Sequence, residues 1–279
     1  MGSGAGLARL RVVTAYRARR GRDRFMDAVD RVTGRRDPLV PPRRLLTDDY
    51  SDFERLGREF RDIFIRVGGL RPEHSVLDVG CGPGRMAVPL TNYLSSDGRY
   101  DGFDMVADEV EWCRRSITPR FPNFRFTLVD VFNERYNPRG AVSPSEFRFP
   151  YEDGAFDFAF LTSVFTHMLA SEVEHYLGEL RRVLRPSGRC LVTGFLLNRE
   201  SQALIASGKS RYAFPYPAGP AWVDDAESPE AAVAYPEDWL TATSRERGLR
   251  VESTHPGDWC GRKGSLSWQD IAILRPTGD

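Results

Sequence analysis

The chemistry of this chain is first indicated by an acidic residue that leads into a glycine-rich loop. Asp78 ends a short apolar run, and Gly80, Gly82 and Gly84 follow it at alternate positions. Such a loop lets a ligand approach the backbone closely. Arg85 stands where the distant glycine of a dinucleotide site would be, and no G-K-[ST] follows as it would in a phosphate loop. An acidic residue at this entrance repels phosphate, so the loop suits an ammonium or a sulfonium group.

Two further aspartates end the next two apolar runs. Asp104 lies 26 residues after Asp78 and can accept hydrogen bonds from two hydroxyl groups of a ribose. Asp130 can accept a hydrogen bond from the amino group of an adenine. Each aspartate alone would be interpreted as a helix cap or a turn residue. Their common place at strand ends favours a cationic ligand that carries a ribose.

Histidines supply the candidates for acid–base chemistry. His167 comes a few residues after the fourth apolar run and is the best placed general base, because an imidazole has an ordinary pKa near ~6.5. An equal alternative is a histidine that packs against, or caps, the helix expected to begin near Ser171. His255 follows the penultimate expected strand, from which it can reach the rim of such a site.

Candidates for holding an acceptor come from two segments. Arg43 and Arg44 follow two prolines and can bind a carboxylate through bidentate hydrogen bonds, although solvated loop arginines are at least as good an interpretation. Tyr212, Tyr216 and Trp222 belong to a long proline-rich stretch, and long loops in compact domains are usually functional or disordered. The aromatic side chains favour a lid that closes over substrate.

These residues need a scaffold that brings strand ends together, and the sequence alternates accordingly. Strands are expected over residues 75–80, 98–104, 124–130, 156–163, 189–197, 249–254 and 267–275, and helices over residues 52–67, 85–94, 106–117, 172–188 and 236–248. Ser171 and Glu174 have the spacing of a capping box at the start of one helix. The alternation predicts an α/β fold whose mostly parallel sheet is covered on both faces by helices.

Two segments lie outside this alternation. Residues 1–68 are expected to form a helical N-terminal extension, whose first 36 residues are rich in arginine. Those arginines suit a surface helix with a solvated outer side, or an acidic partner. Residues 69–279 are expected to form the ligand-binding domain, with a lid insertion over residues 198–235.

Composition argues against several classes of protein. Lys plus Arg and Asp plus Glu both total 39, so no net charge draws the chain toward nucleic acid or an anionic membrane. The apolar stretches are shorter than the ~20 residues of a membrane helix, and no signal sequence is visible, which favours the cytoplasm. The four cysteines and four histidines show no metal-ligand spacing, so reduced thiols and no metal are expected.

Five motifs, taken in order over roughly residues 69–275, resemble those of the class I S-adenosylmethionine-dependent methyltransferases. They are VLDVGCGPG, YDGFDM, LVDVFN, FPYEDGAFDFAFLTSVFTHM and YLGELRRVLRPSGRCLVTGFLL. One glycine loop would be a weak signal, whereas five motifs in order are specific. The resemblance implies a Rossmann-like, seven-stranded sheet whose last strand is antiparallel.

The resemblance also implies a cofactor site that binds S-adenosylmethionine and releases S-adenosylhomocysteine. Its glycine loop would line the methionine part, its second-strand motif the ribose and its third-strand motif the adenine. The cofactor-binding candidates are Asp78, Gly80, Cys81, Gly82, Gly84, Arg85, Asp104, Met105, Asp130, Val131, Thr162 and Ser163.

The implied activity is methyl transfer to a small-molecule or short peptide-like acceptor, in secondary metabolism. A base at His167 and a long lid favour oxygen, in a hydroxyl or a carboxylate, as the accepting atom. N-methylation, a non-catalytic S-adenosylmethionine-binding protein and a dinucleotide enzyme on the same sheet remain alternatives, because a fold does not fix a function. The oligomeric state stays open.

Overall fold

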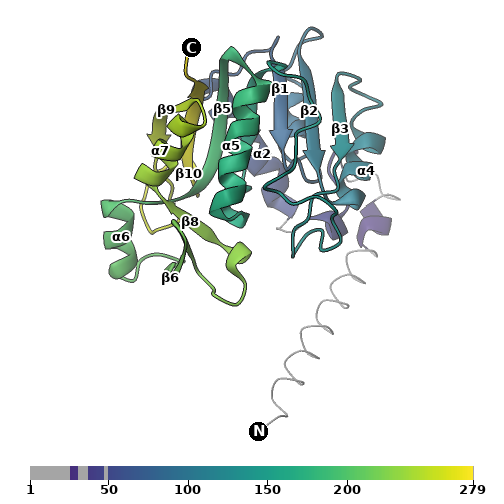
Figure 1. Ribbon diagram of the computed structural model, residues 1–279. Helices are drawn as coiled ribbons and strands as arrows, with labels where there is room; N and C mark the ends of the chain where they lie inside the picture. The colour runs from purple at the N-terminus through teal and green to yellow at the C-terminus, as the bar shows by residue number, and fades with distance from the viewer. Residues whose placement is uncertain (1–25, 31–36, 47–49, 279) are drawn as a thin grey trace.

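Strands and helices alternate along the chain as the sequence predicts (Figure 1). The computed structural model describes residues 26–30, 37–46 and 50–278. Its elements are η1 (Arg43–Leu45), α2 (Tyr50–Arg66), β1 (Ser75–Val79), α3 (Ala87–Leu90), β2 (Arg99–Asp104), α4 (Ala107–Ser116), β3 (Phe124–Leu128), β4 (Phe156–Leu161), η2 (Phe165–His167), α5 (Ala170–Val183), β5 (Leu184–Leu197), α6 (Arg199–Ala206), β6 (Tyr216–Ala218), β7 (Ala221–Val223), η3 (Pro229–Ala231), β8 (Val233–Pro236), α7 (Glu237–Glu246), β9 (Leu249–His255) and β10 (Asp270–Pro276).

Seven of these strands form the expected sheet, in the order β3, β2, β1, β4, β5, β10, β9. The first five run parallel, whereas β10 is antiparallel to both of its neighbours, β5 and β9. The mostly parallel sheet and the antiparallel last strand are therefore confirmed. Parallel strands end at one edge, so the segments that follow β1 to β4 are brought together there.

Each face of the sheet has its own apolar core. α5 contributes Val173, Leu177 and Leu180 to one core, and α2 and α4 contribute Phe64 and Val110 to the other. Figure 1 shows α5 in front of the sheet and α2 behind it. Strands covered on both faces are apolar almost throughout, which explains the continuous apolar runs in the sequence.

The sheet has ten strands rather than seven, because the segment expected to be a lid, residues 198–235, is itself folded. It forms α6, a hairpin of β6 and β7, and β8, which continues the sheet beside the end of β5. Phe195, Phe214 and Trp259 form a small separate core beneath it. Two aromatic residues of the insertion, Phe214 and Tyr212, thus serve this packing.

The helix expected over residues 85–94 is a single turn, α3. Pro89 lies within it and has no N–H to donate along the helix. The hydroxyl of Thr91 donates to the carbonyl of Val88 at 2.7 Å and closes the turn. The glycine loop is therefore not followed by a long helix, and it presents its own backbone rather than a helix dipole.

The cap of α5 also differs from the expected pair Ser171 and Glu174. The carboxylate of Glu172 accepts a hydrogen bond from the backbone N–H of Leu169 at 2.7 Å. The helix begins one residue earlier than Ser171, at Ala170. This places the acidic residue at the third helical position, where a side chain reaches the N-cap backbone.

The N-terminal part is described only in pieces. Most of the arginine-rich segment lies outside the described residues, and residues 26–30 are helical. α2 packs into the body of the domain, where the ring of Phe64 stacks on that of Phe160 with centroids 4.3 Å apart. No helix in the described part of the chain has the length and apolar character to span a bilayer.

Candidate functional site

The loop after β1 turns on three glycines with left-handed backbones. The φ angles are 78° at Gly80, 50° at Gly82 and 86° at Gly84, a region that other residues rarely adopt. A Cβ at Gly80 would lie 2.8 Å from Cγ2 of Val164, and one at Gly84 would lie 2.8 Å from Cδ1 of Ile117. The loop therefore needs glycine for both conformation and space.

Cys81 anchors this loop to β2. Its backbone N–H donates to the carbonyl of Phe103 at 3.0 Å, and the N–H of Gly80 donates to the same oxygen at 2.9 Å. Burial raises the pKa of the Cys81 thiol, which is only 5% exposed and stays protonated. All four cysteines are buried free thiols, in line with the sequence.

Asp104, at the end of β2, holds the glycine loop in place. Its Oδ2 accepts from the N–H of Gly82 at 2.8 Å, and its Oδ1 accepts from the N–H of Val106 at 2.9 Å. Each carboxylate oxygen keeps a second lone pair, so the pair of ribose hydroxyls expected here has acceptors. Met105, next in the chain, is partly buried against the core on the α5 face.

Asp78 lies beneath the loop and not at its mouth. Its side chain is 1% exposed, and Oδ2 accepts a hydrogen bond from the phenol of Tyr100. Oδ1 is buried and has no hydrogen-bond partner among the described residues. Burial raises the pKa of Asp78 to about 8. The sequence indicated an acidic residue at the entrance of the loop. The carboxyl is instead buried under the loop, from where it can affect a ligand through its charge but not by direct contact.

A third carboxyl, Glu109, faces the loop and is absent from the sequence-based candidates. Its Oε2 would be 3.4 Å from a Cβ placed on Gly82. Burial, followed by the charge of Asp104, raises the pKa of Glu109 to about 8, while Arg85 opposes the shift. The signal in the sequence was its position in the first turn of α4, directly after the second-strand motif.

Together these groups fit a cationic cofactor. Asp78, Asp104 and Glu109 lie around the glycine loop, and burial raises the pKa of all three. A raised pKa means that negative charge is poorly compensated there, and a positive ligand would compensate it. The sulfonium and ammonium groups of S-adenosylmethionine have the required charge.

The loop after β3 carries the two adenine candidates. Asp130 is exposed, and its Oδ1 lies 3.5 Å from Nδ2 of Asn137. Val131 is buried and pairs with Val142 in an isolated β-bridge. An exposed carboxylate beside a fixed backbone is compatible with the expected contact to an adenine.

The turn after β4 is strained and is held by a residue of β5 and by the residue that precedes β10. Ser163 has φ of 60°, a left-handed conformation that is unusual for a residue with a side chain. Its N–H donates to Oγ1 of Thr193 at 2.8 Å, and its Oγ donates to Oε1 of Gln269 at 3.1 Å. Thr162, just before it, is half-buried. Strained residues of this kind concentrate at functional sites.

His167 ends the η2 turn that follows this strained residue. Its Nδ1 lies 2.8 Å from the carbonyl oxygen of Glu230 in η3, which can only accept, so Nδ1 carries the proton. The lone pair is therefore on Nε2. Burial, reinforced by the charge of Arg135, lowers the pKa of His167, and the Glu230 carbonyl opposes the shift. A neutral imidazole with a fixed tautomer can act as a base.

The two arginines proposed to bind an acceptor carboxylate already have acidic partners. Arg43 pairs with Asp30, and Nη1 of Arg44 lies 3.8 Å from Oδ2 of Asp27. A substrate carboxylate would have to compete with these partners. Acceptor binding by Arg43 and Arg44 stays a prediction.

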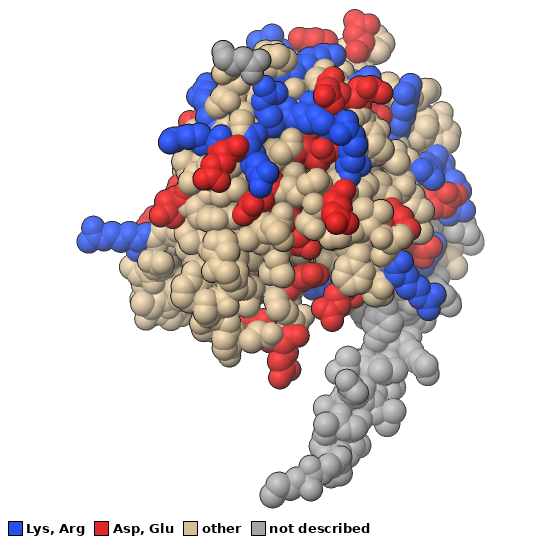
Figure 2. All heavy atoms as spheres, viewed as in Figure 1, with Lys and Arg blue, Asp and Glu red and all other residues tan. Residues whose placement is uncertain are grey.

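The aromatic candidates of the insertion have different environments. Tyr212 packs against Phe195, with ring centroids 5.2 Å apart, whereas Tyr216 is 47% and Trp222 is 38% exposed on the β6–β7 hairpin. In Figure 2 the region over the insertion carries few charged side chains on the face shown. Their role in covering a substrate stays a prediction.

His255 is far from the glycine loop. It ends β9, which is four strand spacings from β1, or about 19 Å across the sheet. Its Nε2 lies 3.1 Å from Oγ of Ser253 on the same strand. A contact with a molecule that reaches the glycine loop would require a large acceptor.

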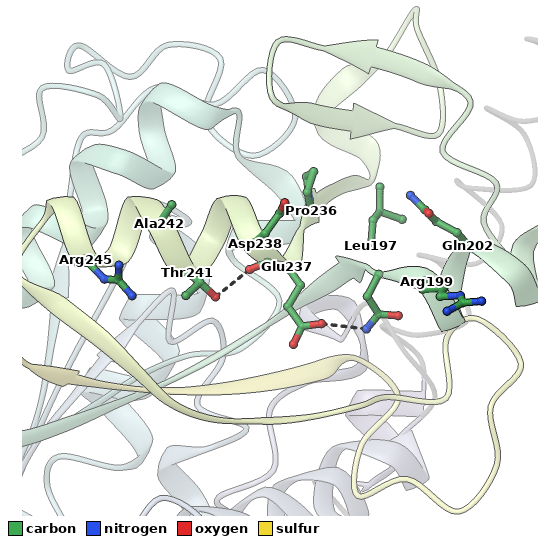
Figure 3. Close-up of a pocket in the computed structure, with 10 residues that line it drawn as sticks. Leu197, Arg199, Gln202, Pro236, Glu237, Asp238, Thr241, Ala242 and Arg245 are labelled. Carbon is green, nitrogen blue, oxygen red and sulfur yellow. Dashed lines mark hydrogen bonds between the residues drawn. The ribbon is translucent and has the colours of Figure 1, made fainter.

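A groove of about 800 Å³ opens beyond the ends of β5 and β8 (Figure 3). Arg199, Glu237 and Arg245 line it, and Oε2 of Glu237 accepts from Nδ2 of Asn198 at 2.9 Å. Its lining residues come from α6, α7 and the strand ends beside them, and none comes from β1, β2 or β4. The groove is therefore distinct from the cofactor site.

Comparison with known proteins identifies the domain. Residues 77–192 match the family described as a methyltransferase domain. An uncharacterized 37.1 kDa protein in transposon TN4556 of Streptomyces fradiae is 29% identical over 170 residues, which cover 61% of this chain and 44% of that protein. The 2-phytyl-1,4-naphtoquinone methyltransferase of Trichormus variabilis is 26% identical over 150 residues, which cover 53% of this chain and 59% of that protein.

The fold is shared with the PH0226 protein of Pyrococcus horikoshii OT3. The TM-score is 0.53 at 16% identity, and the match covers 87% of this chain and 97% of that chain. The chain spans about half the length of the curated relatives it matches. The resemblance seen in the five motifs is therefore confirmed over residues 77–192, which match a methyltransferase domain, and the cofactor is S-adenosylmethionine.

Proposed function

We propose that the protein transfers a methyl group from S-adenosylmethionine to an oxygen of a small-molecule or short peptide-like acceptor. The observation that carries the choice of oxygen is the 2.8 Å contact between Nδ1 of His167 and the carbonyl of Glu230. It leaves Nε2 as a proton acceptor beside the turn after β4. A hydroxyl must lose its proton as it is methylated, whereas a neutral amine attacks through its lone pair.

The residues around the loop bind and orient. Asp104 holds Gly82 and offers lone pairs to the ribose, and Asp130 offers its carboxylate to the adenine. When bound, S-adenosylmethionine would supply a methyl group made electrophilic by its sulfonium, with neutral S-adenosylhomocysteine as the product. In their ionised forms, Asp78 and Glu109 favour the positive charge of the incoming cofactor over the neutral product. His167 takes the hydroxyl proton at Nε2 and returns it to solvent.

A small acceptor is supported by the name of the naphthoquinone methyltransferase, whose substrate is a small molecule. Secondary metabolism and a cytoplasmic setting stay predictions from the sequence. So does the exclusion of nucleic acid as acceptor, since most of the arginine-rich segment lies outside the described residues.

The test uses S-adenosylmethionine with a labelled methyl group and a panel of phenols, carboxylic acids and amines. Label in an ether or an ester, lost with His167→Gln while calorimetry still shows cofactor binding, supports the proposal. Label only in N-methyl products, unchanged by His167→Gln, contradicts the choice of oxygen. Calorimetric binding of NAD in place of S-adenosylmethionine contradicts methyl transfer altogether.

A further inference from the structure

The loop between β3 and β4 is built rigidly over residues 131–142. Isolated bridges join Val131 to Val142 and Asn133 to Asn137. Gly140 packs so tightly against the opposite side of the loop that a Cβ there would lie 2.3 Å from the carbonyl oxygen of Val131. The loop therefore has one defined shape that no side chain at position 140 would permit.

Asn133 fixes the tip of this loop and joins it to the insertion. Its side chain is 8% exposed, and Oδ1 accepts from the N–H groups of residues 135 and 136 at 3.1 and 3.0 Å. Nδ2 donates to Oε2 of Glu230 at 2.8 Å. Glu230 is also the residue whose carbonyl fixes His167, so the loop tip and the candidate base share one support.

The tip presents a cation and an aromatic ring to solvent. The guanidinium carbon of Arg135 lies 5.4 Å from the ring centroid of Tyr136, within the range of a cation–π contact. Arg135 forms no ion pair with any residue that the structure describes. Tyr136 is 40% exposed. A rigid loop thus exposes a guanidinium group and an aromatic ring, two side chains that are suited to binding a ligand.

These two side chains lie beside the candidate base. The rings of Tyr136 and His167 are nearly perpendicular, with centroids 5.9 Å apart. A molecule whose hydroxyl reaches Nε2 of His167 would lie next to the ring of Tyr136. A planar ring can pack on a tyrosine, and an arginine fork can bind a carboxylate with two parallel hydrogen bonds.

We propose that Arg135 and Tyr136 form the binding site for the methyl acceptor, and that this acceptor is a planar aromatic molecule with an anionic group. Tyr136 packs on its ring, Arg135 binds its anion, and His167 receives its hydroxyl proton. The inference rests on the proposed function, whose own test is the binding of the cofactor. The alternative is that Tyr136 contacts the adenine of the cofactor, because the adenine candidates Asp130 and Val131 begin the same loop.

Calorimetry on the protein saturated with S-adenosylhomocysteine tests the proposal with three probes. 4-Hydroxybenzoate is planar and anionic, 4-hydroxybenzyl alcohol is planar and neutral, and 4-hydroxycyclohexanecarboxylate is anionic but not planar. We expect the first to bind about tenfold more tightly than either of the others, since only it satisfies both residues. Equal binding of all three, or binding of none of them by protein that binds S-adenosylhomocysteine, overturns the proposal.

Variants separate the two contacts. Tyr136→Leu and Arg135→Gln should each weaken 4-hydroxybenzoate about tenfold, while Tyr136→Phe keeps the ring and should retain most of the affinity. Arg139→Gln, on the same loop, and Arg211→Gln, an arginine stacked 5.6 Å from the ring of Tyr212, are matched controls that should bind as the wild type does.

The outcomes distinguish this proposal from the one on which it rests. If S-adenosylhomocysteine fails to bind the wild type, the proposed function fails. If Tyr136→Leu weakens S-adenosylhomocysteine and leaves 4-hydroxybenzoate unchanged, Tyr136 belongs to the adenine site and the present inference is overturned. If only the probe is weakened, the acceptor site is supported.

Discussion

The phenol of Tyr100 on β2 donates a hydrogen bond to Oδ2 of Asp78 on the adjacent strand β1. The other carboxyl oxygen of Asp78 has no partner among the described residues, and burial raises the pKa of this carboxyl to about 8. The folded protein therefore keeps a proton on Asp78 at pH values where an unfolded chain, with an ordinary pKa near ~3.9, has lost it. The buried carboxyl costs stability when it ionises, and a bound cation would reduce that cost.

Asp78→Asn should separate stability from cofactor binding. The variant keeps an oxygen for Tyr100 but carries no charge. Because the wild-type pKa is raised on folding, the free energy of unfolding falls as pH rises from about 4 to about 8, by up to about 1.4 kcal/mol per pH unit. The variant lacks this loss, so urea unfolding should show its advantage over the wild type growing from pH 5 to pH 8.

The same variant should bind S-adenosylmethionine about tenfold more weakly, since a negative charge near the loop is removed. Calorimetry above pH 8, where the wild-type carboxyl is ionised, gives the largest difference. Unchanged affinity there would show that Asp78 only supports β1 and β2. An advantage in stability that is equal at pH 5 and pH 8 would show that its pKa is not raised.

Glu109 should couple cofactor binding to proton release. Its pKa of about 8 leaves it largely protonated at pH 7, and a cation beside it favours the ionised form. The affinity for S-adenosylmethionine should therefore rise from pH 6 to pH 8, and the binding enthalpy should depend on the ionisation enthalpy of the buffer. Glu109→Gln should release fewer protons. The control is Glu111→Gln, which alters an exposed partner of Arg115 on the same helix and should behave as the wild type does. Equal proton release by the wild type and both variants would contradict the role of Glu109 in binding the cofactor.

The parallel sheet could be predicted because its strands carry their signal locally. Buried strands such as β4 are continuous apolar runs, and α2 and α4 repeat apolar residues at helical spacing. The insertion carried no such signal, because β6 and β7 have only three residues each and join the sheet through β8, which pairs with the distant end of β5. The apolar residues around α3 favour a longer helix, but Pro89 cannot donate a backbone hydrogen bond and α3 is a single turn.

The sequence motifs predict the positions of the residues that they contain. They do not predict contacts between side chains that are distant in the sequence. The glycine loop and Asp104 lie where the motifs indicated. The burial of Asp78 depends on Tyr100 from the next strand, and the tautomer of His167 depends on Glu230, which is 63 residues away. The first contact arises from the pairing of β1 with β2 and the second from the packing of the insertion against η2, and no local pattern reveals either of them.

His167→Gln should remove the base and leave the cofactor site intact. We expect kcat to fall by about 10²-fold or more, the usual range for a lost general base, with the dissociation constant for S-adenosylmethionine changed less than about twofold. Because burial lowers the pKa of His167, wild-type activity should be lost only below the ordinary imidazole pKa of ~6.5. The variant should lack this acid limb.

His175→Gln is the matched control, since His175 lies on α5 and its Nε2 is 2.9 Å from the carbonyl oxygen of Phe147. It should keep both the rate and the acid limb. A His167→Gln variant with wild-type kcat for a hydroxyl acceptor would remove this histidine from the chemistry.

Gln269 should act on the rate through the strained turn at Ser163. Its Oε1 accepts from the hydroxyls of both Ser163 and Thr193, and the carbonyl of Ser163 accepts from Oγ1 of Thr166 at 3.1 Å, inside the turn that carries His167. Gln269→Leu leaves two hydroxyls without an acceptor, so the free energy of unfolding should fall by about 1–3 kcal/mol. The turn can then relax from its left-handed conformation and displace His167, so kcat should fall about tenfold or more while KM for the acceptor changes little.

Gln269→Glu keeps the accepting oxygen and should restore most of the stability and most of kcat. If Gln269→Leu loses stability but keeps kcat and its pH profile at a temperature where it is folded, the network is structural and does not position the base.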